Sequence, residues 1–265
     1  MDAGNYSLSA LPRALSNCGL TKGGSPTVTS TSESPTPLLN TVLDEIGAEI
    51  VSGTIETGQR FTLRDICVRF DISRTVAREA MRALEQLGMV SSSRRVGITV
   101  LPLSEWSVFD QSIIDWRLAC EASQKKQLNS LNQLRLAIEP IAARMAATEA
   151  TEEEREEILE LAKRLHELEM KPSRRVGEEL ATDLRFHSMV LHASGNEMFA
   201  ALTPSLLSML KGKSVFGSEK RNPIAGTAHL HQELARAIAE QRPDDAENIA
   251  RAILDEARAS AGAKA

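Results

Sequence analysis

The sequence predicts a mainly α-helical protein made of an N-terminal winged helix-turn-helix and a C-terminal all-α helical bundle. Three observations predict this fold class. Residues 62–87 contain two short amphipathic helices with a turn-like gap between them. Residues 90–100 contain two β-prone runs around a basic turn with a glycine, which is typical of a wing. Beyond residue 126, helical periodicity recurs in six segments joined by short polar breaks.

Composition narrows the classes of function. The chain has 265 residues, enough for two ordinary domains, and its 42% hydrophobic and 25% charged content fits a soluble globular protein. Aromatic residues make up only 3%, which argues against a surface that stacks single-stranded nucleic acid. A net charge of −5 is still compatible with DNA binding if the basic groups gather on one face.

The cysteines and the apolar runs favour a cytoplasmic protein. Cys18, Cys67 and Cys120 are far apart and form no metal or disulfide pattern. No apolar run approaches the length of a membrane span, and the N-terminal stretch has no signal-peptide core. We therefore expect reduced thiols and no membrane partner.

The chain is expected to begin with a disordered extension, residues 1–36, which are rich in Ser, Thr, Pro and Gly. The winged helix-turn-helix domain follows over residues 37–101. Its first helix is predicted over residues 38–52 and its second over Thr62–Phe70.

The third predicted helix carries the most information. Ser73 is a good N-cap residue and Gly88 a good residue just beyond a C-terminus, so the helix is expected over Arg74–Leu87. Its apolar residues fall at helical spacing, at Val76, Ala80, Leu84 and Leu87. A basic stripe steps by four residues through Arg74, Arg78 and Arg82. Val76 is about 200° round the helix from Arg74, so the two stripes lie on opposite faces.

A basic stripe on a helix is most often a solvated face. Here the stripe begins at the N-terminus of the second helix of a helix-turn-helix, where such a helix contacts bases and phosphates. A basic wing, Val90–Val100, follows it. The sequence therefore favours binding to double-stranded operator DNA.

The remainder is predicted to be helical throughout. A linker helix is expected over residues 102–125, and an all-helical effector-binding and dimerisation domain over residues 126–265. The predicted bundle helices are Gln127–Ala147, Thr151–Met170, Arg174–Ala193, Glu197–Lys211, Thr227–Gln241 and Pro243–Ala259. Residues 212–226 read as a longer loop that borders a pocket.

Ionisable residues mark one candidate site in the bundle. Asp183 and His187 are four residues apart, so both side chains lie on one helix face. Their spacing fits an Asp–His hydrogen bond on a half-buried helix. With His231 and His229 of a later helix, it also fits a site for zinc or another divalent transition metal.

The N-terminal part resembles the winged-helix domain of GntR-type bacterial transcription regulators. The similar residues are Ser73-Arg-Thr-Val-Ala-Arg-Glu-Ala80, followed by Leu84-Glu85 and Gly88-Met-Val90. The resemblance implies that Arg64, Arg74, Thr75 and Arg78 contact DNA and that Gly97 lies at the wing tip beside Arg95. We include Ser73 in the predicted DNA-binding set.

The C-terminal part resembles the FCD effector domain of the FadR subfamily. The similar stretches are Arg135-Leu-Ala-Ile-Glu-Pro140, Asp183-Leu-Arg-Phe-His187, Ala193-Ser-Gly-Asn196 and His231-Gln-Glu-Leu-Ala-Arg-Ala-Ile238. The resemblance implies a divalent metal held by an Asp and three His residues. Asp183, His187 and His231 match three positions, but the last is Ile253, and His229 is an imperfect substitute. An effector held by polar side chains alone is the alternative.

Three further residues are predicted to bind a small carboxylate effector: Arg135, Asn196 and His229. Arg135 would clamp the carboxylate, or else pair with Glu139 one turn later. Asn196 would line the pocket or cap the next helix, and capping is the stronger expectation. Residues 106–110 and 113–116 further resemble family members that control sugar-acid catabolism, which favours an aldonate or a hexuronate.

The leading hypothesis is a homodimeric repressor that binds operator DNA and is released by a small carboxylate. One rival is a metal-dependent hydrolase that uses Asp183, His187 and His231. No nucleophile elbow, phosphate loop or His-Glu-x-x-His motif supports an enzyme. The other rival is a helical interaction protein whose basic stripe is ordinary surface.

Overall fold

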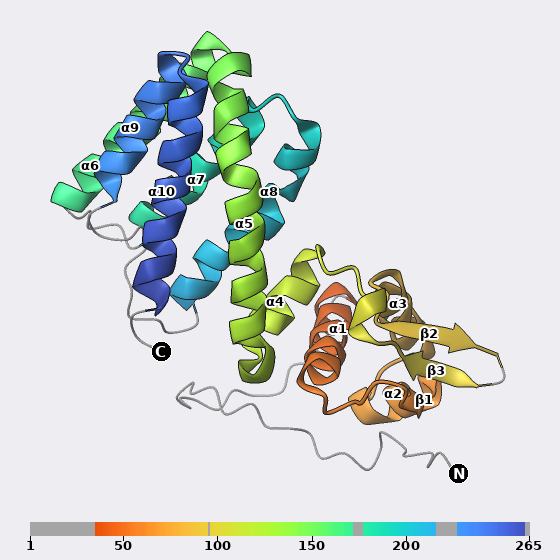
Figure 1. Cartoon of the computed structure of the whole chain (residues 1–265). Helices are drawn as coiled ribbons and strands as arrows, with labels where there is room; N and C mark the ends of the chain where they lie inside the picture. Colours follow the sequence, from red (N-terminus) through yellow and green to blue (C-terminus); the bar gives the residue numbers. More distant parts are fainter. Residues whose placement is uncertain (1–34, 95, 172–176, 216–226, 263–265) are drawn as a thin grey trace. The chain divides into compact units, whose positions relative to one another are not determined.

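The computed structural model describes residues 35–94, 96–171, 177–215 and 227–262 (Figure 1). The chain divides into two compact units, one up to Trp116 and one from Arg117. The predicted N-terminal extension lies outside the described residues. No helix among the described residues combines the length and the apolar character needed to cross a membrane.

The first unit has the predicted winged helix-turn-helix order. Its helices are α1 (Pro35–Ser52), α2 (Leu63–Phe70) and α3 (Arg74–Gln86), and its strands are β1 (Arg60–Phe61), β2 (Val90–Ser93) and β3 (Gly97–Val100). The strands form an antiparallel sheet in the order β1-β3-β2. The wing is confirmed, but β1 was not predicted: two residues carry too little pattern, and their pairing with Ile98 and Thr99 is non-local.

Side chains that cap the helix ends explain where α2 and α3 start. The Thr62 hydroxyl accepts from the backbone N–H of Asp65, and the Asp65 carboxylate accepts from the N–H of Thr62 at 2.8 Å, a reciprocal capping box. Ser73 accepts from the N–H of Val76 at 3.3 Å, which confirms it as the predicted N-cap residue of α3. Asp71 ends α2 in the left-handed region, with φ of 52°.

The linker region departs from the prediction of one helix over residues 102–125. It contains a short 3-10 helix, η2 (Leu103–Glu105), and then α4 (Gln111–Ala119). The Trp116 indole donates to the Asp44 carboxylate at 3.0 Å, and its ring fills the space that a side chain at Gly47 would need. Ile113 and Trp116 thus complete the hydrophobic core of the first unit beside α1. The aromatic residues were recognised from the sequence, but their partner was not.

The second unit consists of six described helices, as predicted. They are α5 (Glu121–Glu149), α6 (Glu152–Met170), α7 (Glu178–Ala193), α8 (Glu197–Val215), α9 (Ala228–Ala239) and α10 (Pro243–Gly262). Because α5 begins at Glu121, the domain boundary predicted at residue 126 falls inside a helix. Part of the predicted loop over residues 212–226 is helical up to Val215, and the rest lies outside the described residues.

Small residues line the contacts between the bundle helices. α10 packs along α5 and α9, and α6 packs against α7 and α9. Buried alanines recur at these contacts, where they allow close approach of the helix backbones; they include Ala143, Ala146, Ala147, Ala162, Ala235 and Ala246. α5 packs against α7, the helix that carries Asp183 and His187, and His231 of α9 reaches to 3.4 Å from Asp183.

Trp116→Ala should destabilise the first unit. The indole is 8% exposed, and truncation would open a cavity against α1 and remove its hydrogen bond to Asp44. We expect a loss of about 3–5 kcal/mol in the free energy of unfolding. Urea unfolding should show the loss. Val108→Ala, at a residue that is 37% exposed, is the control and should cost far less. An equal effect of the two changes would contradict the assignment of Trp116 to this core.

Candidate functional site

Helix α3 has two opposite faces, as its sequence predicts. Ala77, Ala80, Met81 and Leu84 are buried in the core of the first unit, and Val76 and Leu87 pack partly buried against it. Arg74, Arg78 and Arg82 are exposed. This apolar packing against the rest of the unit keeps the guanidinium groups at the surface.

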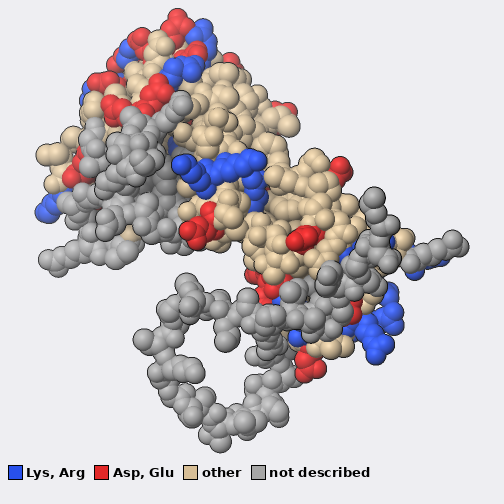
Figure 2. Space-filling model, turned by 60° about the horizontal axis from the view of Figure 1, so that its bottom comes forward, with Lys and Arg blue, Asp and Glu red and all other residues tan. Residues whose placement is uncertain are grey.

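The arginines of α3 border an open groove of about 720 Å³. Its lining includes Arg64 from α2, the three α3 arginines and Ser92, Arg94 and Gly97 from the wing. Blue side chains gather over this unit on the right-hand side of Figure 2. Arg82 pairs with Glu79 at 2.8 Å, whereas Arg74 and Arg78 take part in no ion pair within the described part of the chain. The groove therefore offers free cations to an anionic ligand.

The other predicted DNA-binding residues also lie near this groove, except one that cannot be placed. Arg64 and Thr75 are exposed, on α2 and α3. Gly97 opens β3 with φ of 89°, and a side chain there would come within 2.8 Å of the Phe61 carbonyl oxygen, so both its conformation and its close contact require glycine. Arg95 lies outside the described residues.

The wing is tied to α3 by one hydrogen bond that the sequence did not indicate. The Glu85 carboxylate accepts from the backbone N–H of Ser92 at 2.8 Å. In the sequence, Glu85 stands out only as part of the Leu84-Glu85 pair of the family resemblance. Its bond holds the base of the wing against α3, so the two basic elements present one surface.

Three buried residues converge in the bundle. Asp183 and His187 of α7 and His231 of α9 each offer a ligand atom, and these atoms lie within 4.8 Å of one another. Asp183 Oδ1 is 3.7 Å from His187 Nε2 and 3.4 Å from His231 Nε2. Their side chains are at most 8% exposed. The structure thus brings together the three residues predicted as metal ligands.

Each histidine has its other ring nitrogen occupied. His187 Nδ1 lies 3.0 Å from Glu139 Oε2, and His231 Nδ1 lies 2.9 Å from the Thr227 carbonyl oxygen. A carboxylate and a carbonyl oxygen only accept, so both Nδ1 atoms donate. A neutral imidazole then carries its lone pair on Nε2, the atom that faces Asp183. His231 Nε2 is buried without a hydrogen-bond partner among the described residues.

This donor set fits a divalent transition metal. Two unprotonated imidazole nitrogens and one carboxylate are ligands typical of zinc and similar ions. The Nδ1 bonds to a carboxylate and a backbone carbonyl are the usual outer partners of metal-bound histidines. The buried Nε2 of His231, without a partner, is the observation that a bound cation would account for.

Electrostatics keeps both carboxylates of the site ionised. Burial alone would raise the pKa of Glu139, but the charge of Arg135, together with the hydrogen bonds from His187 and Arg135, outweighs burial and lowers the pKa to about 2. Burial opposes ionisation of Asp183 in the same way, and contacts with His231, His187 and Arg135 lower its pKa. Asp183 is therefore a charged ligand at neutral pH.

Arg135 takes the second of its two predicted roles. It is 2% exposed, and its Nε and Nη2 atoms donate to the two carboxylate oxygens of Glu139, the second at 3.0 Å. Both interactions lie within α5. The guanidinium is thus committed to Glu139 and, through it, to His187. The sequence paired Arg135 with Glu139 but missed the link to His187, because nothing local indicates that α5 and α7 meet there.

The other two predicted effector residues are separate from this cluster. Asn196 Oδ1 accepts from the N–H groups of Met198 at 2.9 Å and Phe199 at 3.4 Å, so it caps α8, as was the stronger expectation. His229 is exposed on α9 and does not join Asp183, His187 and His231. Side chains two residues apart on a helix point in nearly opposite directions, which accounts for the separation of His229 from His231.

Ile253 lies where the family pattern places its last histidine. It lines a cavity of about 10 Å³, room for about one water molecule, together with Glu139, His187, Val190, Leu234 and Ala250. Ile253 therefore reaches the edge of the site from α10 but offers no ligand atom. Metal binding would have to rely on three protein ligands from the described residues.

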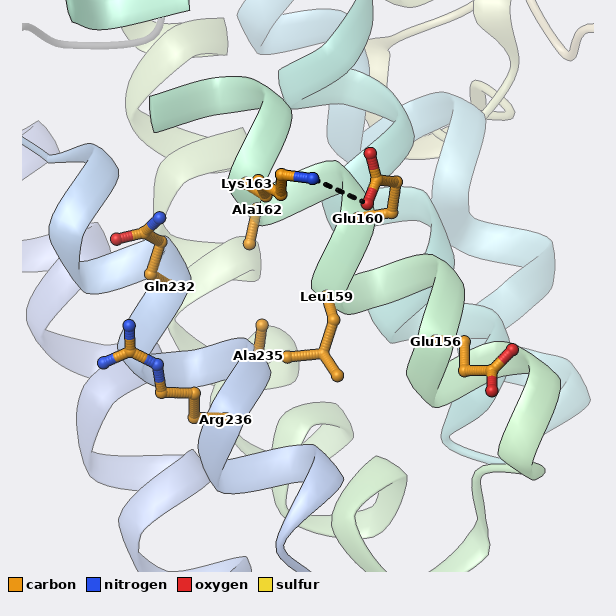
Figure 3. A pocket seen from close by; sticks show the side chains of 8 residues that line it. All are labelled: Glu156, Leu159, Glu160, Ala162, Lys163, Gln232, Ala235 and Arg236. Carbon is orange, nitrogen blue, oxygen red and sulfur yellow. Dashed lines mark ion pairs between the residues drawn. The ribbon is translucent and has the colours of Figure 1, made fainter. Parts of the chain in front are cut away.

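A separate hollow of about 470 Å³ lies between α6 and α9 (Figure 3). Leu159 and Ala235 point into it, and Glu160 and Lys163 at its rim form an ion pair at 3.7 Å. Its described lining includes none of the residues predicted to bind metal or effector. We therefore assign the bundle site to the Asp–His cluster and not to this hollow.

Comparison with known proteins decides the family. Residues 38–100 match the family described as bacterial regulatory proteins, gntR family, and residues 130–256 match the FCD domain. The Uxu operon transcriptional regulator of Escherichia coli K12 is 30% identical over 223 residues, which are 82% of this chain and 79% of that protein. The chain belongs to the GntR family. It is a DNA-binding transcription regulator with an FCD domain.

Two further similar proteins are also transcription regulators or share the fold of this GntR regulator. The galactonate operon transcriptional repressor of Escherichia coli K12 is 26% identical over 213 residues, 79% of this chain and 90% of that protein. The solved structure of Lar, which controls expression of the Listeria monocytogenes agr system, covers 86% of this chain and 96% of its own with a TM-score of 0.53. At 14% identity, that likeness shows the fold alone.

Arg74→Ala and Arg78→Ala should each weaken specific DNA binding. Each removes a free, exposed guanidinium from the groove face of α3 without disturbing the buried side of the helix. We expect losses of about 1–3 kcal/mol in binding free energy, measured by fluorescence anisotropy on operator DNA. Arg185→Ala, at an exposed arginine on α7, is the control and should leave affinity unchanged. Unchanged affinity of both α3 variants would contradict this DNA-binding face.

Proposed function

We propose that this GntR regulator is a homodimeric repressor of a sugar-acid catabolic operon, released from its operator by a small carboxylate effector. The observation that carries the DNA-binding part is the row of exposed arginines on α3 over an open groove. The proposed DNA contacts are Arg64, Ser73, Arg74, Thr75, Arg78, Arg95 and Gly97. Such a regulator acts in the cytoplasm, where its operator lies.

Dimerisation is proposed from the geometry of operator recognition. A single recognition helix reads only one short half-site in the major groove. Two copies related by a two-fold axis read a pseudopalindrome and double the contact area. We assign the dimer contact to the second unit, because α3 and the wing of the first unit are needed for DNA.

We propose that Asp183, His187 and His231 hold a divalent metal such as zinc. When bound, the metal supplies a positive centre that attracts and orients a carboxylate. The chain's own residues supply the ligand atoms, bury the site and exclude competing water. Because Ile253 offers no ligand atom, these three residues would hold the metal, and it would supply a positive centre for the effector carboxylate.

A sugar acid is the proposed effector class. Two relatives are named for the galactonate and Uxu operons, which supports an aldonate or a hexuronate. The effector must bind one arrangement of the two DNA-binding units more tightly than the other, since equal affinity shifts no equilibrium. Arg135 is not proposed as the clamp for its carboxylate, because the side chain is 2% exposed and two of its five N–H groups already bond Glu139.

The hydrolase that would use Asp183, His187 and His231 is not favoured. The similar proteins are transcription regulators, and a regulator needs the same cluster only to bind. The interaction-protein alternative is likewise not favoured, because the matched family binds DNA. We therefore propose that this cluster binds metal and effector and catalyses no reaction.

His187→Ala should abolish the response to effector and spare DNA binding. The change removes a proposed metal ligand 3.7 Å from Asp183 in the second unit, whereas α3 belongs to the first unit. Operator gel shifts with increasing galactonate or hexuronate should show release of the wild type only. A thermal-shift screen with and without chelator should show a metal-dependent effector response in the wild type. His192→Ala, an exposed histidine on the same helix, is the control. A normal response of His187→Ala would contradict the proposed effector site.

A further inference from the structure

One carboxylate links the buried arginine of α5 to the metal-ligand histidine of α7. Glu139 Oε2 accepts from Arg135 Nη2 at 3.0 Å and lies 3.0 Å from His187 Nδ1. Arg135 is 2% exposed, Glu139 4% and His187 6%. Water is therefore largely excluded from these bonds, and among the described residues it is this carboxylate that lies against His187 Nδ1.

We propose that Glu139 is a positioning residue that fixes the proton of His187 on Nδ1 and turns its Nε2 lone pair toward Asp183 and His231. The inference rests on the metal site proposed above. Glu139 itself offers no atom to that site, since its contact is with the far side of the imidazole ring. Nothing in the three-ligand set predicts this role.

The physical reason is that a carboxylate can only accept hydrogen bonds. A neutral imidazole carries one N–H, and an acceptor at Nδ1 holds the proton there. Nε2 is then unprotonated, which is the form that a metal requires. Without the acceptor, the proton would exchange between the two nitrogens, and the population with Nε2 protonated would have to rearrange before it could bind a cation.

Arg135 supports this role indirectly. A buried carboxylate without a cation is costly, and the guanidinium fork bonds both oxygens at once. That grip sets the plane of the Glu139 carboxylate and so the direction in which Oε2 faces His187. Arg135 thus acts on His187 indirectly, through its hydrogen bonds to Glu139.

The two histidines are oriented by different means. His231 donates to the carbonyl of Thr227 on its own helix, four residues earlier, so α9 alone orients it. His187 on α7 depends on a side chain from α5, a separate helix that packs against it. A change at Glu139 should therefore affect His187 and leave His231 as it is.

The test replaces the whole ion pair, because removal of Glu139 alone would leave Arg135 buried and uncompensated. The double variant Arg135→Met/Glu139→Leu removes the acceptor and both charges. Arg135→Lys retains the charge and the Glu139 acceptor and is the conservative variant. Long-range 1H–15N spectra of the metal-free full chain report which ring nitrogen carries the proton, with the signals of His187 assigned from His187→Gln. Zinc titration then gives the affinity of each variant.

In the wild type and in Arg135→Lys, we expect His187 to carry its proton on Nδ1. In the double variant we expect both tautomers of His187, an unchanged His231, and zinc affinity lower by about 10–100-fold. If the double variant keeps the Nδ1–H form, or binds zinc within twofold of the wild type, the inference is wrong. If the wild type binds no zinc, the proposed metal site fails, while the tautomer comparison still decides the role of Glu139.

Two further variants guard against a purely structural effect. Arg69→Met/Glu49→Leu removes a part-buried Arg–Glu pair between α2 and α1 in the first unit, and should change neither the His187 tautomer nor the zinc affinity. Arg135→Leu/Glu139→Met is a second double variant in case the first does not fold. It also removes the acceptor and both charges, so mixed tautomers of His187 are expected. A pure Nδ1–H form in either folded double variant would overturn the inference.

Discussion

The buried ion pair between Arg135 and Glu139 organises the centre of the FCD bundle. Each charge would be costly alone in this interior, and together they satisfy one another through two bonds within α5. Glu139 Oε2, which accepts from Arg135 Nη2, also faces His187. The Asp–His cluster is therefore supported by a charge pair on another helix. Because each buried charge has a partner, ionisable groups are tolerated in an otherwise apolar and alanine-rich core.

In the first unit, helix α3 has one face that packs in the core and an opposite face that is exposed. Its buried side is small and apolar, and its exposed side carries three arginines that border one groove with the wing. The Glu85 bond to Ser92 and the close approach of Gly97 to Phe61 hold the wing beside that helix. Of these arginines, Arg82 pairs with Glu79, and within the described residues Arg74 and Arg78 form no ion pair, which suits them to the proposed contact with DNA.

The linker region before α5 packs in the core of the first unit, which the sequence alone did not indicate. Trp116 donates to Asp44 and packs where Gly47 leaves room, so the start of α4 belongs to the core of the DNA-binding unit. Helix α5 begins at Glu121, which leaves only a few residues between the anchor and the effector domain.

Local sequence by itself determined the winged helix-turn-helix, the six bundle helices, the two faces of α3 and the family. These features depend on periodicity, caps such as Ser73 and Asn196, and motifs within short windows. Only the tertiary structure decided that β1 pairs with β3, that Trp116 docks on α1, and that Glu139 orients His187. Each of these is a contact between residues far apart in the chain, and spacing within one element carries no information about which elements pack together.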